Sequence, residues 1–439
     1  MDSISPLDGR YRDRLTQVRN IFSELALTRT RCRVEILHCL RLDKIFTSLT
    51  YDQVSGAYKL LQRFDTEDFL KIKSIESKIN HDVKAVELYL RDELDLDNPN
   101  RIHFGLTSED VNNLAWSVMF KEFKDTAHIS QLKSLCSTLL ILCERWKTSP
   151  FPARTHGQHA TPTTAGKEIA VFLNRLVDPV VSITDHRFHG KLNGATGTYA
   201  AMKLACPGLD WIDHERSILE ELGLERNIAT TQIEDGASLC RYLDHVRTVN
   251  NVLIDLCQDI WMYISYGYFM QRAVKHEVGS STMPHKINPI NFENAEGNLQ
   301  LSNALLGFMT DKLSRSRMQR DLSGSTVIRN VGVALSHHYL ALLQLKEGLG
   351  KITLNNVLCI KEIDSHPELL AEALQTVMRT RSKDDVYDNV KTITRGKETL
   401  QLEQYLRDEG LNIKPSEYIG DCNRICEDVI NHARNNLKI

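Results

Sequence analysis

A long uninterrupted helical pattern constrains this chain more than any other feature. From Leu239, apolar residues recur every three or four positions through Ile264, and neither glycine nor proline occurs until Gly267. This spacing marks one face of a helix. At 1.5 Å per residue such a helix is roughly 40 Å long, more than a small domain needs. The chain must therefore bury long helical stripes against one another, as helix bundles do.

Two further stretches show the same spacing, residues 111–146 and a stripe from Leu335 to Ile352. The chain has 22 glycines and 11 prolines in 439 residues. This is below the average of roughly 12% combined, which favours long helices over tight turns. Helices of this length can pack within one chain or against other subunits, and periodicity alone favours neither arrangement.

The length of the chain predicts more than one domain, because 439 residues exceed the size at which a single core stops growing. Short helical patterns are interrupted near residues 94–100, and the long patterns follow. We predict an all-α fold with a central long-helix bundle. Its parts are an N-terminal helical domain (1–106), the central bundle domain (107–350) and a C-terminal helical domain (351–439).

Composition excludes several classes of protein. The net charge is only −3, and no basic stripe indicates a nucleic-acid binder. The ten cysteines are scattered without a C-x-x-C pair, which argues against a disulfide framework or a zinc site and fits a reducing compartment. No apolar run approaches the roughly 18 residues of a membrane span, and the first residues do not resemble a signal peptide. We expect a cytoplasmic protein that binds neither nucleic acid nor membrane.

The sharpest candidate site is the segment 279–289, which reads GSSTMPHKINP. It lies between two helical patterns, and Gly279, Pro284 and Pro289 prevent a continuous helix. Hydroxyls, an imidazole, an ammonium group and an amide are crowded between these helix breakers. A plain solvent loop would not need so many different groups, so the pattern favours a functional loop.

A second candidate, residues 153–162 (ARTHGQHATP), carries two histidines, His156 and His159. Thr161 followed by Pro162 predicts the N-cap and the first residue of a helix, with both histidines in the loop before it. A single loop histidine more often makes only local hydrogen bonds, and that alternative stays open here.

Two more segments are ambiguous on residue types alone. Thr107 and Asp110 have the spacing of a capping box, although a helix N-terminus also binds carboxylates and phosphates. Arg320, Ser325 and Arg329 could converge on an oxyanion, because arginine offers a bidentate donor. The alternative for this second segment is a solvated basic turn.

These segments together resemble the conserved stretches of the fumarase/aspartase superfamily. Segment 279–289 resembles its loop signature, and residues 155–158 (THGQ) and 107–110 (TSED) resemble the other two stretches, in the right order. The resemblance implies a helical three-domain fold and an intersubunit helix bundle. Of the two arrangements of the long helices, packing within one chain or against other subunits, it therefore favours the second. We expect a homotetramer with shared active sites.

Within that superfamily the chain is similar to the adenylosuccinate lyases of the common bacterial type. The similar stretches are residues 6–11 (PLDGRY), 80–87 (NHDVKAVE), 231–234 (TQIE) and 319–322 (QRDL). The resemblance covers nearly the whole chain. It implies a C–N lyase that cleaves adenylosuccinate to AMP and fumarate by anti β-elimination in purine biosynthesis. The succinylated carboxamide ribonucleotide SAICAR would be cleaved to AICAR and fumarate in the same way.

The resemblance also implies residue roles, with no cofactor and no metal ion. Ser280 is expected to be the general base and His156 the general acid, with Glu293 orienting His156 and Lys286 assisting catalysis. The residues expected to hold the succinyl carboxylates are Thr107, Ser108, Gln232, Lys286 and Asn288. Those expected to bind the phosphate and nucleotide are Arg10, Tyr11, Arg320, Ser325 and Arg329. Asn80, His81, Asp82 and Asn294 are expected to line the same site.

Two positions depart from the family pattern. His159 stands where a proline is frequent, and Gly324 stands where an acidic residue is common. Two rival hypotheses remain, a sibling lyase for argininosuccinate or a 3-carboxymuconate, and a catalytically silent protein on the same scaffold. The Arg320, Ser325 and Arg329 set disfavours the sibling, because a substrate without phosphate does not need it. An assay of fumarate release separates the silent protein from an enzyme.

Overall fold

The computed structural model describes residues 3–275, 281–382, 385–395 and 400–439. The chain forms two compact units. The first consists of Met1–Gln131, Ser182–Asn250 and Asn298–Leu340, and the second of Leu132–Val181, Asn251–Gly297 and Ala341–Ile439. The fold is mostly helical, as predicted, and its strands form small two-stranded sheets. The predicted three-domain boundaries stay a prediction.

The long helices confirm the periodicity. The predicted stripe from Leu239 lies on α11 (Ala237–Ser265). Its apolar positions are buried, namely Leu243, Val246, Val249, Leu253, Leu256 and Ile260. Residues 111–146 form α6 (Ser108–Phe123) and α7 (Ile129–Trp146), joined by a π-helical turn at Lys124–His128. The other long helices are α8 (Ala165–Asp185), α12 (Ile290–Leu313) and α14 (Val331–Leu349). The stripe predicted to reach Ile352 ends earlier, because Ile352 begins a strand.

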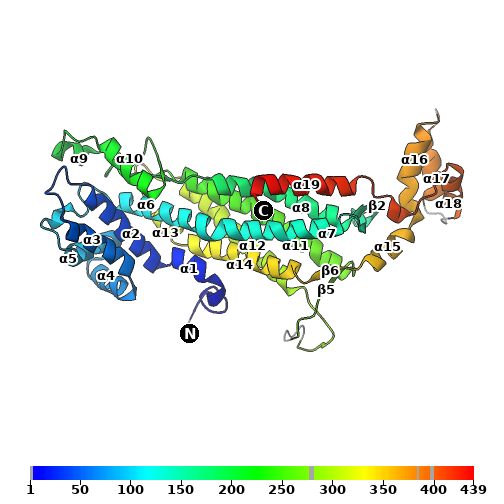
Figure 1. Ribbon diagram of the computed structural model, residues 1–439, viewed down its shortest axis with the longest axis horizontal. Helices are drawn as coiled ribbons and strands as arrows, with labels where there is room; N and C mark the ends of the chain where they lie inside the picture. Colours follow the sequence, from blue (N-terminus) through cyan, green and yellow to red (C-terminus); the bar gives the residue numbers. More distant parts are fainter. Residues whose placement is uncertain (1–2, 276–280, 383–384, 396–399) are drawn as a thin grey trace. The chain divides into compact units, whose positions relative to one another are not determined.

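In the first unit, four helices near the N-terminus share one core (Figure 1). They are α2 (Glu24–Leu40), α3 (Tyr51–Arg63), α4 (Thr66–Ile79) and α5 (Asp82–Glu93). Their buried contacts include Cys32, Ile36, Leu60, Ile72, Val86 and Leu90. Burial of such apolar side chains contributes about 1.5–3 kcal/mol each, which fixes the corner between α4 and α5 against α2. The remaining elements of this unit are α1 (Thr16–Phe22), α9 (Ala200–Ala205), α10 (Trp211–Leu222), α13 (Ser323–Ile328), β3 (His189–Gly190) and β4 (Glu225–Arg226).

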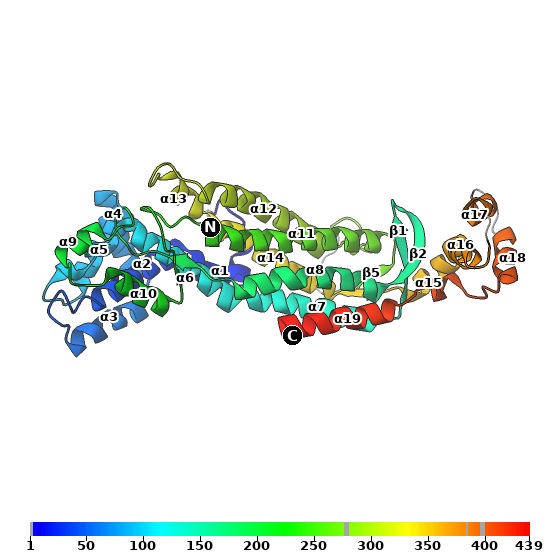
Figure 2. The ribbon, with the colours of Figure 1, turned by 90° about the horizontal axis from the view of Figure 1, so that it is seen from above.

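The second unit contains a β-hairpin and a cluster of short helices. Strands β1 (Pro150–Thr155) and β2 (Gln158–Thr164) pair antiparallel, as do β5 (Phe269–Gln271) and β6 (Ile352–Leu354). The hairpin lies beside α15 (Asn356–Asp364), as Figure 2 shows. The other helices are α16 (Ala371–Arg379), α17 (Val386–Thr394), α18 (Leu400–Asp408) and α19 (Cys422–Leu437). Among the described residues, none of these helices or the long ones combines the length and apolar character needed to cross a membrane.

Candidate active site

Three predicted substrate-binding residues lie at the corner between α4 and α5. Asn80 ends α4 with φ at 54°, a left-handed conformation that asparagine tolerates. The ring of His81 then caps α5, because its Nδ1 accepts a hydrogen bond from the backbone N–H of Lys84 at 3.2 Å. Asp82 is thereby the first residue of α5, where the helix dipole favours a carboxylate. Local turn chemistry thus sets the direction of the Asp82 side chain.

One carboxylate oxygen of Asp82 accepts hydrogen bonds from two arginines. Its Oδ2 accepts hydrogen bonds from Arg31 at 2.8 Å and from Arg329 at 2.7 Å. Burial raises the pKa of Asp82, but the guanidinium groups of Arg31 and Arg329 outweigh burial and lower this pKa to about 2. Sequence reasoning missed Arg31, because a lone arginine inside a helix pattern carries no signal of its own.

The start of α6 confirms the predicted capping box. The buried carboxylate of Asp110 accepts a hydrogen bond from the backbone N–H of Thr107 at 2.9 Å. The same carboxylate pairs with the buried Lys191 at 2.9 Å and accepts from the Gly194 N–H at 3.1 Å. The first turn, with half-buried Thr107 and Ser108, is therefore fastened to a neighbouring loop and held in place.

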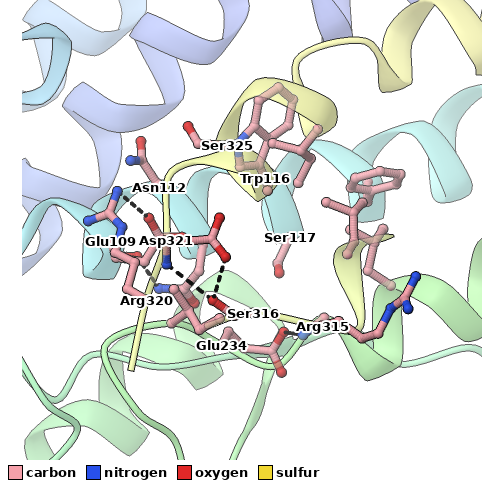
Figure 3. Close-up of a pocket in the computed structure, with 18 residues that line it drawn as sticks. Glu109, Asn112, Trp116, Ser117, Glu234, Arg315, Ser316, Arg320, Asp321 and Ser325 are labelled. Carbon is pink, nitrogen blue, oxygen red and sulfur yellow. Dashed lines mark hydrogen bonds and ion pairs between the residues drawn. The ribbon is translucent and has the colours of Figure 1, made fainter. Parts of the chain in front are cut away.

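A pocket opens beside this turn (Figure 3). Arg320 and Ser325, both predicted to bind the phosphate, line this pocket. Arg320 contacts the pocket residue Glu109 at 3.3 Å and donates to Oε1 of the predicted Gln232 at 3.0 Å. Burial raises the pKa of Glu109, and Arg320 only partly offsets this. The apolar wall consists of Trp116, Phe120, Ile233, Leu239, Leu313 and Ile328.

One of the other predicted phosphate-binding residues, Arg329, lies at a second cavity in the same unit. Arg329 lines it together with Asp8 and Arg19. Arg10, two residues after Asp8, is exposed, with its guanidinium carbon 5.8 Å from the ring centre of the half-buried Tyr11. The structure thus brings Arg320 and Ser325 to one pocket and places Arg329 with Asp82 and Asp8.

In the second unit, His156 lies at the tip of the β1–β2 hairpin. Thr155 pairs with Gln158, so His156 and Gly157 form a two-residue turn. Both residues have positive φ, 52° and 76°, which is the type I′ geometry that matches the twist of paired strands. The His156 side chain is exposed, and its backbone direction is set by the hairpin.

This arrangement corrects the predicted helix start. Thr161 and Pro162 belong to strand β2, and α8 begins only at Ala165. The pairing register shifts between Phe151 and Ala153, opposite this part of β2. Proline is tolerated at such an irregularity, because no ladder hydrogen bond is required from it there. The sequence signal that was missed is His-Gly between two short extended runs.

An arginine next to the turn of the hairpin connects it to the rest of the unit. Arg154 donates to Glu362 at 2.9 Å and to the Tyr268 hydroxyl at 3.0 Å, and its guanidinium carbon lies 4.8 Å from the ring centre of Tyr266. Its cross-strand neighbour is His159, whose pKa is lowered by burial and by Arg154. His159 therefore lies next to the hairpin turn, and no local sequence pattern indicated the Arg154 cluster around it.

The signature loop is described from Ser281 onward, and the predicted base Ser280 lies outside the described residues. Residues 281–289 form no helix, as predicted from the prolines, and α12 begins at Ile290. Lys286 is exposed and Asn288 is half-buried. Gln271 donates to the Ile287 carbonyl at 3.0 Å, which ties this loop to strand β5.

Glu293 and Asn294 lie in the first turn of α12, beyond the signature loop. Glu293 is exposed, and its Oε1 accepts a hydrogen bond from Trp261 Nε1 at 3.0 Å within its own chain. Asn294 is half-buried. The pairing of Glu293 with His156 stays a prediction.

The fold is shared with solved enzymes. The structure is similar to a fumarate lyase from Mesorhizobium sp. BNC1, with a TM-score of 0.79 and 17% identity over 95% of this chain and 97% of that one. It is equally similar to a 3-carboxy-cis,cis-muconate lactonizing enzyme from Pseudomonas putida, with a TM-score of 0.79 and 19% identity over 96% and 97%. These likenesses show that the protein has the fumarase/aspartase-like fold.

Sequence comparison narrows the class to one family. Residues 9–302 match the lyase family model, and residues 316–417 match the model for the adenylosuccinate lyase C-terminal region. Among relatives named adenylosuccinate lyase, that of Legionella pneumophila (strain Corby) is 40% identical over 96% of this chain and 97% of its own. The relatives of Dictyostelium discoideum (41% identity, 90% and 88% coverage) and Escherichia coli K12 (39%, 90% and 89%) are similar. The chain belongs to the adenylosuccinate lyase family.

Proposed function

We propose that the protein cleaves adenylosuccinate to AMP and fumarate, and SAICAR to AICAR and fumarate, by anti β-elimination in purine biosynthesis. The observation that carries this proposal is family membership over nearly the whole chain. The cationic and hydroxyl groups around the corner of the first unit, including Arg320, Ser325 and Arg329, fit a phosphate-bearing substrate. An argininosuccinate or carboxymuconate substrate would not require them.

The elimination needs one base and one acid on opposite sides of the breaking bond. In the proposal, Ser280 takes the proton from the succinyl carbon next to the carboxylate, the carbon–carbon double bond forms, and the C–N bond breaks. His156 gives a proton to the departing purine nitrogen, a task suited to an imidazole near neutral pH. The support for His156 is its exposed position on a rigid hairpin tip.

Charge builds on the succinyl carboxylate when its neighbouring carbon loses a proton. Donors placed there in advance stabilise the transition state more than the ground state. The proposed donors are Lys286, Asn288, Thr107, Ser108 and Gln232. Support for the Thr107 and Ser108 pair is the first turn of α6, since Asp110 holds its backbone in a fixed position.

The phosphate and nucleotide are assigned to the first unit. Arg320 and Ser325 share one pocket, and Arg329 lines a second cavity and donates to Asp82. Arg10, Tyr11, Asn80 and His81 complete the proposed binding surface of this unit. Gly324 has open space around the position of a Cβ atom, so an acidic side chain would fit there sterically.

We further propose a homotetramer with shared active sites, in the cytoplasm. Support for association is an exposed apolar stripe on α12, in which Leu301 and Phe308 are 55% and 58% exposed. His156 and Glu293 are both exposed on a single chain and accessible to other subunits. The ten unpaired cysteines fit a reducing compartment.

A direct test is to mix the purified protein with adenylosuccinate and to follow the ultraviolet change as AMP and fumarate form. Argininosuccinate and 3-carboxymuconate serve as competing substrates. Fumarate release from adenylosuccinate alone is the expected result. Fumarate release from argininosuccinate instead of adenylosuccinate would overturn the proposal. A protein that releases fumarate from none of these substrates would overturn it as well.

A further inference from the structure

A buried arginine connects the two arginines proposed to bind the phosphate. Arg31 lies on α2 with only 4% of its side chain exposed, so it does not reach a ligand in the pocket itself. Its terminal nitrogen donates to Asp82 Oδ2 at 2.8 Å, the same oxygen that accepts from Arg329 at 2.7 Å. Its Nε donates to Asn112 Oδ1 at 2.9 Å.

Asn112 extends this connection to the pocket. It lines the pocket together with Glu109, which in turn pairs with Arg320. Arg31 therefore lies between two series of side chains. One leads through Asp82 to Arg329, and the other leads through Asn112 and Glu109 toward Arg320. Each contact belongs to the first compact unit.

The charges explain why Arg31 is present. Burial lowers the pKa of Arg31, and the carboxylate of Asp82 counteracts this, so Asp82 is the counter-charge of the buried guanidinium. With two guanidinium groups and one carboxylate, one positive charge is left over at the surface, where Arg329 is 43% exposed. If Asp82 faced Arg329 alone, an incoming phosphate would have to compete with the carboxylate for its only partner. A carboxylate stripped of its partner inside a protein is strongly unfavourable.

We propose that Arg31 is a positioning residue that keeps a permanent counter-charge on Asp82, which frees Arg329 to bind the substrate phosphate. The proposal rests on the proposed function, because it assumes that Arg329 contacts the nucleotide. A guanidinium is needed for this role, since its fork serves Asp82 and Asn112 at once. A lysine supplies the charge but only as a single flexible group.

The test measures the dissociation constant of AMP by calorimetry, together with kcat and KM for adenylosuccinate. Arg31→Gln is expected to weaken AMP binding by about 10- to 100-fold, the range of one charge-assisted hydrogen bond. KM should rise more than kcat falls, and Arg31→Lys should be intermediate. Arg33→Gln is the matched control, because Arg33 is an exposed arginine on the same helix. It should leave AMP binding unchanged.

A double-mutant cycle distinguishes positioning from a general structural role. In an Asp82→Asn background, Arg31→Gln should add little further loss of AMP affinity, because the carboxylate through which Arg31 acts is gone. Equal losses in both backgrounds, or a folded Arg31→Gln protein with wild-type AMP affinity, would overturn the proposal. If Arg31→Gln fails to fold, wild-type AMP affinity in Arg31→Lys would overturn it as well.

Two controls separate this inference from the proposed function. Arg329→Ala should weaken AMP binding by a similar factor, which shows that Arg329 reaches the nucleotide. A wild-type protein that releases no fumarate would contradict the proposed function. The inference alone would be contradicted by a different combination of results. In that case the wild-type protein releases fumarate and Arg329→Ala binds AMP weakly, but Arg31→Gln binds AMP normally.

Discussion

The Nε2 atoms of His128 and His338 lie 2.8 Å apart inside the first unit, with both side chains fully buried. His338 Nδ1 lies 2.6 Å from Asn250 Oδ1, and the Asn250 amide nitrogen donates to Asn303 at 2.9 Å. Asn250 Oδ1 therefore accepts, so His338 carries its proton on Nδ1 and accepts on Nε2. His128 then donates from Nε2 and accepts at Nδ1 from the Tyr242 hydroxyl at 2.7 Å. His338 must be neutral to accept on Nε2, and burial, which lowers the pKa of His128 well below its ordinary value, favours a neutral His128 as well.

This pair predicts a loss of stability in mild acid. Burial lowers the pKa of His338 to about 3 and that of His128 well below its ordinary value. An unfolded imidazole titrates near 6.5, so between roughly pH 6.5 and 3 the unfolded chain binds more protons. The free energy of unfolding should therefore fall as the pH drops through this window. Denaturant titrations at pH 7.5 and 5 measure it, and a His128→Gln/His338→Gln double variant should show a smaller pH dependence. An unchanged dependence in that variant would contradict the assignment.

Removal of the proposed acid or base should abolish turnover. His156→Asn is the sharper variant for the acid, because asparagine before glycine suits the type I′ turn and leaves the hairpin intact. Ser280→Ala removes the proposed base. Each variant should lose at least ~10²–10⁴ in kcat, the range of one acid–base group. His432→Ala, at an exposed position on α19, is the control and should keep its activity. A kcat within about tenfold of wild type for either site variant would refute its role.

The contacts of Arg154, next to the hairpin turn, should affect catalysis through the position of His156. Arg154→Gln removes the contacts with Glu362 and Tyr268 that fasten the hairpin. A displacement of about 1 Å at a reacting group can cost up to roughly 100-fold in rate. We expect kcat to fall while AMP affinity stays near wild type, because the nucleotide is assigned to the other unit. Steady-state kinetics and AMP calorimetry measure the two effects, and Arg424→Gln on α19 is an exposed control. Loss of AMP binding with unchanged kcat would contradict this role.

Shared active sites predict that two inactive variants complement each other. If His156 and Ser280 of one site come from different subunits, random mixing of Ser280→Ala and His156→Asn protomers leaves about a quarter of the sites intact. Co-denatured and refolded mixtures should then recover activity toward a quarter of wild type, measured as fumarate release. Sedimentation should show that the mixed tetramers contain both variants. If such tetramers remain inactive, both residues of a site lie on one chain.

The sequence by itself determined the features that depend on near neighbours. The stripe of α11 follows from apolar spacing within one helix, and the Thr107–Asp110 capping box follows from hydrogen bonds across a single turn. The prolines of segment 281–289 likewise delayed α12 until Ile290. Each of these outcomes depends on residues at most a few positions apart, where side-chain spacing and backbone chemistry are sufficient.

The tertiary structure decided the contacts between distant segments. Thr161 and Pro162 have the local pattern of a helix start, but pairing with residues 150–155 makes them part of a strand. Asp82 meets Arg31 across 51 residues and Arg329 across 247, and no local pattern indicates either partner. These contacts form only because packing of α2, α5 and the neighbouring helices brings the charged groups together in a buried corner. There an unpaired charge would be too costly, so the fold selects the partners that the sequence alone leaves open.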